Sequence, residues 1–318
     1  MKAMTTPRNA VLRRADQTGP AVLMILGSCV SLQFGAALAV QMFDGVGPLG
    51  ATTLRLTIAA AILLVVIRPD VRRWTRRQWI AVVAFGAAIG AMNGAFYSAI
   101  DRLPLGVAVS IEFTGPLILA AVLSRSRTDL AWVSLAVAGM ALLGIESITG
   151  AESLDPVGVA FALLAGSFWA GYILTSARAG RLVPGHDGLA VALVVSAVVV
   201  MPLGGAGASA AFEDLHLLAL AAVVALLASV IPYSLEFAAV RRLPKHVFGV
   251  LLSLEPIVAA IAGWLLLDQS LGPVRLAAIM LVILASIGTT VTASRMRRRQ
   301  TDSPAELSRR PAASRHGG

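Results

Sequence analysis

Ten long apolar runs, separated by short polar connections, dominate the chain. They occupy residues 20–41, 48–67, 78–99, 104–123, 130–148, 157–178, 188–204, 215–239, 246–267 and 273–293. An α-helix needs roughly 20 apolar residues to cross the hydrocarbon core of a bilayer, and it satisfies its backbone polar groups without water. A transmembrane β-barrel would instead show short segments of alternating polarity. The pattern therefore predicts an all-α membrane protein with ten transmembrane helices.

The composition agrees with a protein that lies in a lipid bilayer. Of the 318 residues, 57% are hydrophobic and 14% are charged, whereas soluble domains carry about 25% charged residues. The single cysteine, Cys29, lies within the first run, so we expect no disulfide. A signal peptide ending near Ala37-Leu38-Ala39 is an alternative interpretation of that run, but its removal would leave an odd number of helices.

The distribution of charge predicts the orientation of the helices. The formal net charge of +9 would suit a nucleic-acid-binding protein, but most of the 26 basic residues lie in alternate connections. The connection after the second run contains Arg68, Arg72, Arg73, Arg76 and Arg77, while the intervening connections collect acidic residues. Basic connections stay on the cytoplasmic side of a membrane. We therefore expect both termini in the cytoplasm and no nucleic-acid partner.

An internal repeat divides the ten runs into two groups of five. With an offset of 140 residues, Arg102-Leu103-Pro104 falls on Arg242-Leu243-Pro244 and Pro116 falls on Pro256. Because each repeat holds an odd number of helices, the second repeat enters the membrane in the opposite direction, as in many secondary transporters. The expected organisation is a cytoplasmic N-terminal segment (1–19), two inverted five-helix repeats (20–149 and 150–294) and a disordered basic cytoplasmic tail (295–318).

Small residues recur at helical spacing in several runs. Gly86, Gly90 and Gly94 share one face of the third run, and Gly158 and Gly166 share one face of the sixth. Such faces let helix backbones approach closely in lipid. They predict close helix packing, and they could also leave space for a ligand.

Ionisable residues inside the predicted spans are the strongest candidates for function. Glu112, Glu236 and Glu255 lie in the fourth, eighth and ninth runs, and Arg55 lies in the second. A charge near the bilayer centre costs about 2.5–3.5 kcal/mol on insertion scales and by default marks a functional site. The alternative is that the glutamates are neutral and hydrogen-bonded to neighbouring groups.

Prolines predict interruptions of three of these helices. A proline lacks an N–H group and clashes with the carbonyl group four residues earlier. Pro116, in the pair Gly115-Pro116, should free the carbonyl of Glu112, and Pro256 and Pro232 should free those of Leu252 and Ala228. Simple packing kinks would leave the same pattern.

Helical phase places further polar and aromatic groups where they could share one central cavity. The expected substrate- and proton-binding residues, from helices one, three, four, six, eight and nine, are Gln33, Asn93, Tyr97, Glu112, Trp169, Tyr172, Tyr233, Glu236 and Glu255. Helices five, seven and ten carry few polar residues, and we expect them to face lipid or the other repeat. The sequence contains no zinc-protease, nucleophile-elbow or Walker motif, so we expect no enzyme activity, cofactor or metal.

Three stretches resemble a known family. The segments LPLGVAVSIEFTGPL (103–117), IPYSLEFAAVRRLP (231–244) and LLSLEPIVAAIAGWLLLDQ (251–269) are similar to the EamA-type branch of the drug/metabolite transporter superfamily, and within it to bacterial threonine/homoserine exporters. The resemblance implies ten helices in two inverted repeats around a central cavity in the bacterial inner membrane. It also implies export of threonine, homoserine or related small amino acids, driven by the proton gradient; a homodimer is a further expectation.

Glu112 is the residue that we expect to couple proton and substrate. Burial favours the protonated form of a carboxyl group and an approaching cation favours its ionised form, so a proton and a substrate ammonium would compete for one site. Asn93, Tyr97, Tyr172 and Tyr233 are candidates to bind the substrate carboxylate. Arg55 is a weaker candidate, which could instead pair with an acid or extend toward the membrane surface.

Two other functions are compatible with the sequence. The first is export of another metabolite or of amphipathic drugs, for which Trp169 and Tyr172 would suit aromatic cations. The second is a membrane enzyme that acts on lipid-linked substrates, which would need catalytic groups near the membrane interface.

Overall fold

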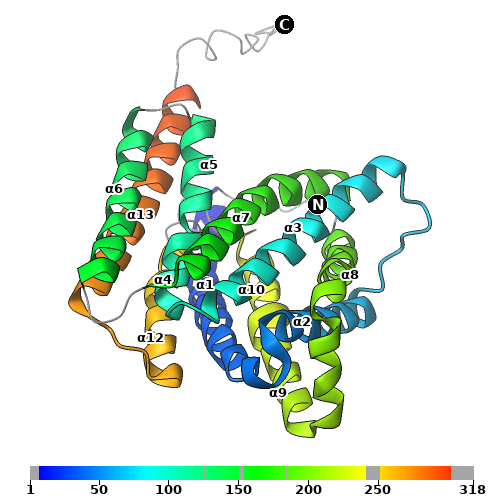
Figure 1. Ribbon diagram of the computed structural model, residues 1–318. Helices are drawn as coiled ribbons and strands as arrows, with labels where there is room; N and C mark the ends of the chain where they lie inside the picture. Colours follow the sequence, from blue (N-terminus) through cyan, green and yellow to red (C-terminus); the bar gives the residue numbers. More distant parts are fainter. Residues whose placement is uncertain (1–6, 125–126, 150–153, 184, 241–250, 302–318) are drawn as a thin grey trace, which may run out of the picture.

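A computed structural model describes residues 7–124, 127–149, 154–183, 185–240 and 251–301 of the chain, and these residues form helices and no strand (Figure 1). Seven helical segments are long and apolar enough to cross a membrane: Gly19–Val40, Phe43–Ile67, Arg76–Ile100, Pro156–Leu182, Asp187–Glu213, Leu215–Glu236 and Pro273–Thr292. Shorter apolar helices cover Leu105–Leu119, Leu130–Leu142 and Glu255–Leu267, which lie within the other three predicted runs. The predicted all-α fold is therefore confirmed for the described residues, and seven of its helices have the length and composition of membrane spans.

The helices of the first half follow the predicted runs closely. They are α1 (Pro7–Val40), α2 (Phe43–Ile67), α3 (Arg76–Ile100), α4 (Leu105–Glu112), α5 (Thr114–Ser124) and α6 (Arg127–Thr149). The start of α3 is fixed by a capping box, in which the Thr75 side chain accepts from the backbone N–H of Gln78 and the Gln78 side chain accepts from that of Thr75. Such reciprocal caps satisfy N–H groups that lack a partner at the start of a helix.

The helices of the second half are α7 (Pro156–Leu182), α8 (Asp187–Ala210), α9 (Leu215–Ala225), α10 (Ile231–Val240), α12 (Glu255–Leu267) and α13 (Pro273–Thr301). A short 3₁₀ turn, η1 (Ala211–Glu213), follows α8, and a π-helical turn, η2 (Leu226–Val230), joins α9 to α10. The last helix continues past the predicted boundary at 294, so the first part of the expected tail is helical, and residues 302–318 lie outside the described part. Arg242-Leu243-Pro244, the predicted counterpart of Arg102-Leu103-Pro104, likewise lies outside the described part.

The contacts between helices have a regular pattern. Helices α6 and α13 pack together with α5 on one side of the molecule, whereas α2 packs on α8 and α9 on another (Figure 1). Between them, α1 packs on α10 and α12, while α7 packs on α3, α4 and α5. The contacts of the two halves correspond under the internal repeat. The contacts of α1 with α10 and α12 match those of α7 with α3 and α5, and the pairs α2–α8 and α6–α13 each join equivalent helices of the two halves.

Each helix that contains one of the three prolines Pro116, Pro232 and Pro256 is interrupted just before it. The α-helical pattern breaks at Phe113, between α4 and α5, and at the turn of Ser253 and Leu254 that precedes α12. These breaks occupy equivalent positions under the offset of 140 residues. The third interruption is η2, which ends two residues before Pro232. Single π-helical turns of this kind are frequent at functional sites.

Glycines make the central helix contacts close. A Cβ atom on Gly90 would lie 2.9 Å from the carbonyl oxygen of Ser196 in α8, and one on Gly35 would lie 2.8 Å from the backbone nitrogen of Ala228 in η2. Real Cβ atoms essentially never come within 3.0 Å of such atoms. The small residues thus serve close packing, as small-residue ladders do in membrane proteins.

Candidate functional site

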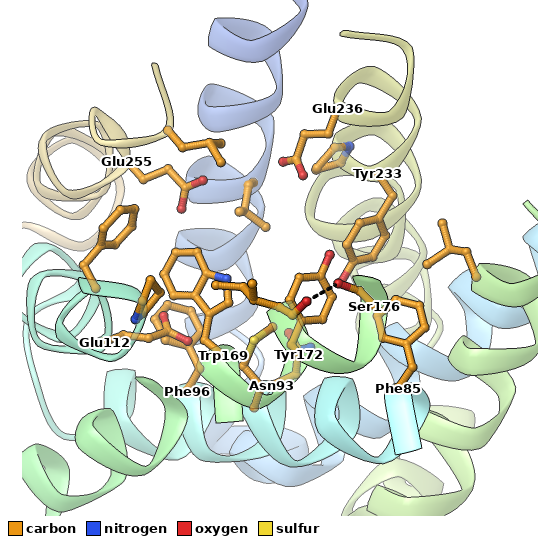
Figure 2. A pocket seen from close by; sticks show the side chains of 18 of the residues that line it. Phe85, Asn93, Phe96, Glu112, Trp169, Tyr172, Ser176, Tyr233, Glu236 and Glu255 are labelled. Atoms are coloured by element: carbon orange, nitrogen blue, oxygen red, sulfur yellow. Dashed lines mark hydrogen bonds between the residues drawn. The ribbon is translucent and has the colours of Figure 1, made fainter. Parts of the chain in front are cut away.

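A cavity of about 730 Å³ lies at the centre of the helical bundle. Side chains from α1, α2, α3, α4, α5, α7, α8, α10, α12 and α13 line it. Its volume is in the range of about 300–1,000 Å³ that is typical of small-molecule sites. Figure 2 shows how side chains from separate helices converge on this space.

Most of the residues that the sequence singled out line this one cavity. Those that do are Gln33, Asn93, Glu112, Pro116, Trp169, Tyr172, Pro232, Tyr233, Glu236 and Glu255. Tyr97, Gly115 and Pro256 are not among its lining residues. Tyr97 is fully buried, and Gly115 packs against the backbone of Gly166 in α7. The structure therefore brings the three glutamates together, as expected, but it gives Tyr97 a supporting position.

The three glutamates reach the cavity from three different helices. In Figure 2, Glu236 and Glu255 lie on one side of the pocket and Glu112 lies nearer to Trp169 and Phe96. The Ser28 hydroxyl donates to Oε1 of Glu236 over 2.7 Å, and Nε2 of Gln33 lies 3.5 Å from Oε2 of Glu255. Helix α1 thus positions two of the three carboxyl groups.

The backbone carbonyl of Glu112, at the break between α4 and α5, packs against α7. A Cβ atom on Gly166 would meet the carbonyl oxygen of Glu112, so this carbonyl lies against α7. Gly166 leaves room for the backbones of the two helices to touch at this point. The side chain of Glu112, in contrast, lines the cavity.

Arg55 is a cavity residue to which sequence reasoning gave too little weight. Its side chain enters from α2, is 2% exposed, and lines the cavity. One terminal nitrogen donates to the Tyr97 hydroxyl over 3.1 Å, and the other donates to Oδ1 of Asn93. The guanidinium carbon also lies 4.8 Å from the centre of the Tyr97 ring. The signal was present in the sequence, since an arginine inside an apolar run is as unusual as a glutamate.

Helix α13 also contributes to the cavity. Ser286, Thr289 and Thr290 line it, and the Ser286 and Ser253 hydroxyls are 2.6 Å apart. The expectation that the tenth helix faces only lipid or the other repeat is therefore wrong. Short hydroxyl side chains can bond to their own helix backbone and still present an oxygen to a cavity, so they disturb the apolar pattern little.

Aromatic rings form the walls between the polar groups. Trp169 makes an edge-to-face contact with Phe113, with ring centres 4.7 Å apart, and Tyr172 packs on Phe85 at 5.4 Å. Rings that are fixed in this way stabilise each other by about 0.5–1.5 kcal/mol beyond their burial. They give the cavity rigid apolar walls around its polar groups.

Charges within the cavity are kept apart. The only ion pair within 4.0 Å in the described part of the chain joins Arg102 and Asp155 at 2.9 Å, outside the cavity. Arg55 is therefore not in direct contact with any of the three glutamates. In the described part of the chain, no group of three or more His, Cys, Asp or Glu side chains is placed so that it could hold a metal ion. The site can thus receive a small molecule that carries both a positive and a negative group.

At one end of the bundle, polar side chains join the two halves of the chain. Arg102 precedes α4, and Asp155 caps the start of α7 by accepting from the backbone N–H of Val157. Nearby, Oε1 of Gln269 accepts from the backbone N–H of Leu105 over 2.9 Å. The cavity extends the other way along α7, to Gly180 and Val183 and on to Gly188 at the start of α8.

Comparison with known proteins gives a consistent result. The model of the EamA-like transporter family matches residues 19–149 and again residues 156–291. The chain is 39% identical over 274 residues to the threonine/homoserine exporter RhtA of Salmonella typhimurium strain LT2, covering 86% of this chain and 92% of the relative. It is 38% identical over 271 residues to RhtA of Escherichia coli strain K12, covering 85% and 91%.

A more distant relative and a solved structure are also similar to this chain over most of its length. The uncharacterized transporter YwfM of Bacillus subtilis strain 168 is 25% identical over 272 residues, which cover 82% of this chain and 89% of that protein. A crystal structure with 20% sequence identity superposes with a TM-score of 0.55 and covers 87% of this chain and 98% of its own, which shows a shared fold. The chain belongs to the EamA-like transporter family.

Proposed function

We propose that this protein exports small amino acids of the threonine/homoserine type across the bacterial inner membrane. The observation that carries this proposal is the 38–39% identity to threonine/homoserine exporters over most of both chains. The cavity supports it, because it combines carboxyl groups, a guanidinium group and amide and hydroxyl groups in a space suited to a small molecule. These groups match the ammonium, carboxylate and hydroxyl groups of threonine and homoserine.

The transport cycle that we propose is alternating access by two inverted repeats of five transmembrane helices each. Three features support this arrangement: the family model matches the chain twice, the helix breaks at Phe113 and at Ser253–Leu254 are equivalent, and the helix contacts of the two halves correspond. Two similar halves in opposite orientations can exchange conformations and so open the same site to either side.

In this proposal the structure represents the state that is open to the cytoplasm. The cavity extends toward the end of α7 that carries Arg178 and Arg181, which the distribution of basic residues assigns to the cytoplasm. The ion pair of Arg102 with Asp155 would then close the periplasmic side. Both termini would lie in the cytoplasm.

Glu112 is the residue that we propose for proton coupling. Glu112 is the last residue of α4, directly before the break at Phe113, and its side chain lines the cavity. It has no basic partner within 4.0 Å among the described residues. A carboxylate without a fixed counter-ion can bind a proton or a substrate ammonium in turn. Substrate binding would then require proton loss, and protonation from the periplasm would release the substrate, which gives antiport.

Counterflow in proteoliposomes tests this function. Vesicles that contain the purified protein and unlabelled threonine should accumulate labelled threonine and homoserine, and they should not accumulate labelled glutamate or lysine. An imposed pH gradient should drive net threonine movement against the direction of proton flow. Counterflow of no amino acid in a well-folded sample would refute the proposal, and substrate movement that ignores the pH gradient would refute proton antiport.

Export of aromatic or amphipathic compounds is the second candidate function. Phe85, Phe96, Phe113, Trp169 and Tyr172 line the cavity and would suit flat apolar groups. A panel of growth-inhibitory compounds separates the two functions. Overexpression would raise tolerance to amphipathic drugs if this candidate is correct, and it would raise tolerance to threonine and homoserine if the first is correct.

A further inference from the structure

Arg55 is a buried cation with an incomplete set of partners. Its side chain is 2% exposed, and its Nε atom has no hydrogen-bond partner. The two groups that accept from its terminal nitrogens, the Tyr97 hydroxyl and the Asn93 amide oxygen, are both neutral. Taking a charge out of water is unfavourable unless another charge or a full set of hydrogen bonds compensates. A bound anion would supply the negative charge and the hydrogen-bond acceptors that the Arg55 guanidinium group lacks.

The guanidinium group is held in a fixed orientation at the cavity. Two hydrogen bonds and the Tyr97 ring, at 4.8 Å, restrict its rotation. Asn93 is itself fixed, because its Nδ2 donates to the carbonyl of Ile89 over 2.8 Å. A planar guanidinium group offers parallel N–H donors that match the two oxygens of a carboxylate, which an ammonium group cannot do.

Two of the three cavity glutamates lie on the opposite side of the pocket from the contact of Arg55 with Asn93. In the view of Figure 2, Asn93, which contacts Arg55, lies across the pocket from Glu236 and Glu255. None of the three glutamates forms an ion pair with Arg55 in the described part of the chain. The arrangement keeps one positive group and several carboxyl groups available to a single ligand.

We propose that Arg55 binds the carboxylate of a zwitterionic α-amino acid, while a cavity glutamate receives its ammonium group. This inference rests on the proposed function and names the chemical feature by which the site selects its substrate. An amine that lacks the carboxylate leaves Arg55 without a counter-ion. The site therefore rejects such an amine even when its side chain equals that of threonine.

The test compares threonine with two analogues as competitors of labelled threonine counterflow. Threonine amide keeps the ammonium group and lacks the carboxylate, whereas N-acetylthreonine keeps the carboxylate and lacks the ammonium group. For the wild type we expect threonine amide to compete at least about 30-fold more weakly than threonine, the size of a lost charged hydrogen-bond pair. In Arg55→Gln this ratio should fall to about threefold or less, and Arg55→Lys should give an intermediate value.

Controls separate this role from a structural one. Arg73→Gln removes an exposed arginine from the α2–α3 connection and should keep the wild-type ratio. N-acetylthreonine should remain a poor competitor in Arg55→Gln, because it lacks the ammonium group that a cavity glutamate binds. If Arg55→Gln does not transport, the affinities for threonine and threonine amide are compared through the shifts that each ligand causes in the melting temperature of the purified protein.

The outcomes distinguish the two proposals. Wild-type protein that performs no amino-acid counterflow refutes the proposed function. Wild-type protein that transports threonine, with an Arg55→Gln variant that still discriminates against threonine amide as the wild type does, refutes the role of Arg55 alone.

Discussion

The contact between Gly166 and the interrupted fourth helix gives a prediction whose size follows from the geometry. A Cβ atom on Gly166 would lie 2.5 Å from the carbonyl oxygen of Glu112 and 3.3 Å from the backbone nitrogen of Gly115. Real Cβ contacts essentially never fall below 3.0 Å. Because both neighbouring atoms belong to the backbone, neither can rotate away. In Gly166→Ala, α7 must therefore move from α4 and α5 by at least about 0.5 Å.

A matched control is available on the same helix. A Cβ atom on Gly171 meets nothing within 4 Å. Both substitutions gain the same helix propensity, about 1 kcal/mol for alanine over glycine, so their difference isolates the contact. Overpacking of this kind costs about 1–3 kcal/mol. Gly166→Ala should therefore be less stable than Gly171→Ala by that amount.

Thermal unfolding and transport measure the two consequences. With about 2–4 °C for each kcal/mol, Gly166→Ala should melt about 2–12 °C below Gly171→Ala when both are heated in the same detergent at the same rate. Because the displaced backbone carries Glu112, threonine counterflow per folded molecule should also fall in Gly166→Ala and stay near wild type in Gly171→Ala. Equal melting temperatures and equal transport for the two variants would refute the proposed contact.

Two further predictions concern single hydrogen bonds. Tyr97→Phe removes the hydroxyl that accepts from Arg55 and should weaken threonine binding about 2- to 10-fold, as measured by competition in counterflow. Unchanged binding would contradict the positioning role of Tyr97. Arg102, which donates to the Asp155 carboxylate, lowers the pKa of that group, and the N–H of Val157 adds to the effect. The ion pair therefore stabilises the fold at neutral pH and is lost as the pH falls below about 4. The melting temperature of the wild type should exceed that of Asp155→Asn from pH 8 to 5 and approach it in stronger acid; a difference that grew with acidity would contradict this assignment.

The sequence predicted the helical spans and the cavity glutamates for the same physical reason. Lipid offers no hydrogen bonds, so spans must be long and apolar and any ionisable residue within them stands out. Glu112, Glu236 and Glu255 were found in this way, and all three line the cavity. Prolines similarly predicted where helices are interrupted, since the loss of an N–H group is a local property.

Other parts of the site depend on tertiary contacts that the pattern does not contain. The Glu112 carbonyl faces α7 because Gly166 lies opposite it, which only the packing of two distant segments determines. Thr289 and Thr290 donate to the carbonyl groups of Ala285 and Ser286 on their own helix. Since these hydroxyl groups are satisfied by their own helix, the sequence does not indicate whether they face lipid or the cavity. The position of Arg55 was ambiguous for a related reason, because a long side chain can extend toward the membrane surface or into the bundle.

The most direct test of the proposed mechanism is threonine efflux from cells that express Glu112→Gln at the wild-type level. Glu213→Gln, at an exposed position in η1, is the matched control. We predict that Glu112→Gln exports threonine at least about tenfold more slowly, the effect of losing one charged contact, and that its residual rate no longer depends on external pH. Wild-type efflux with wild-type pH dependence in Glu112→Gln would contradict the central role of this carboxyl group.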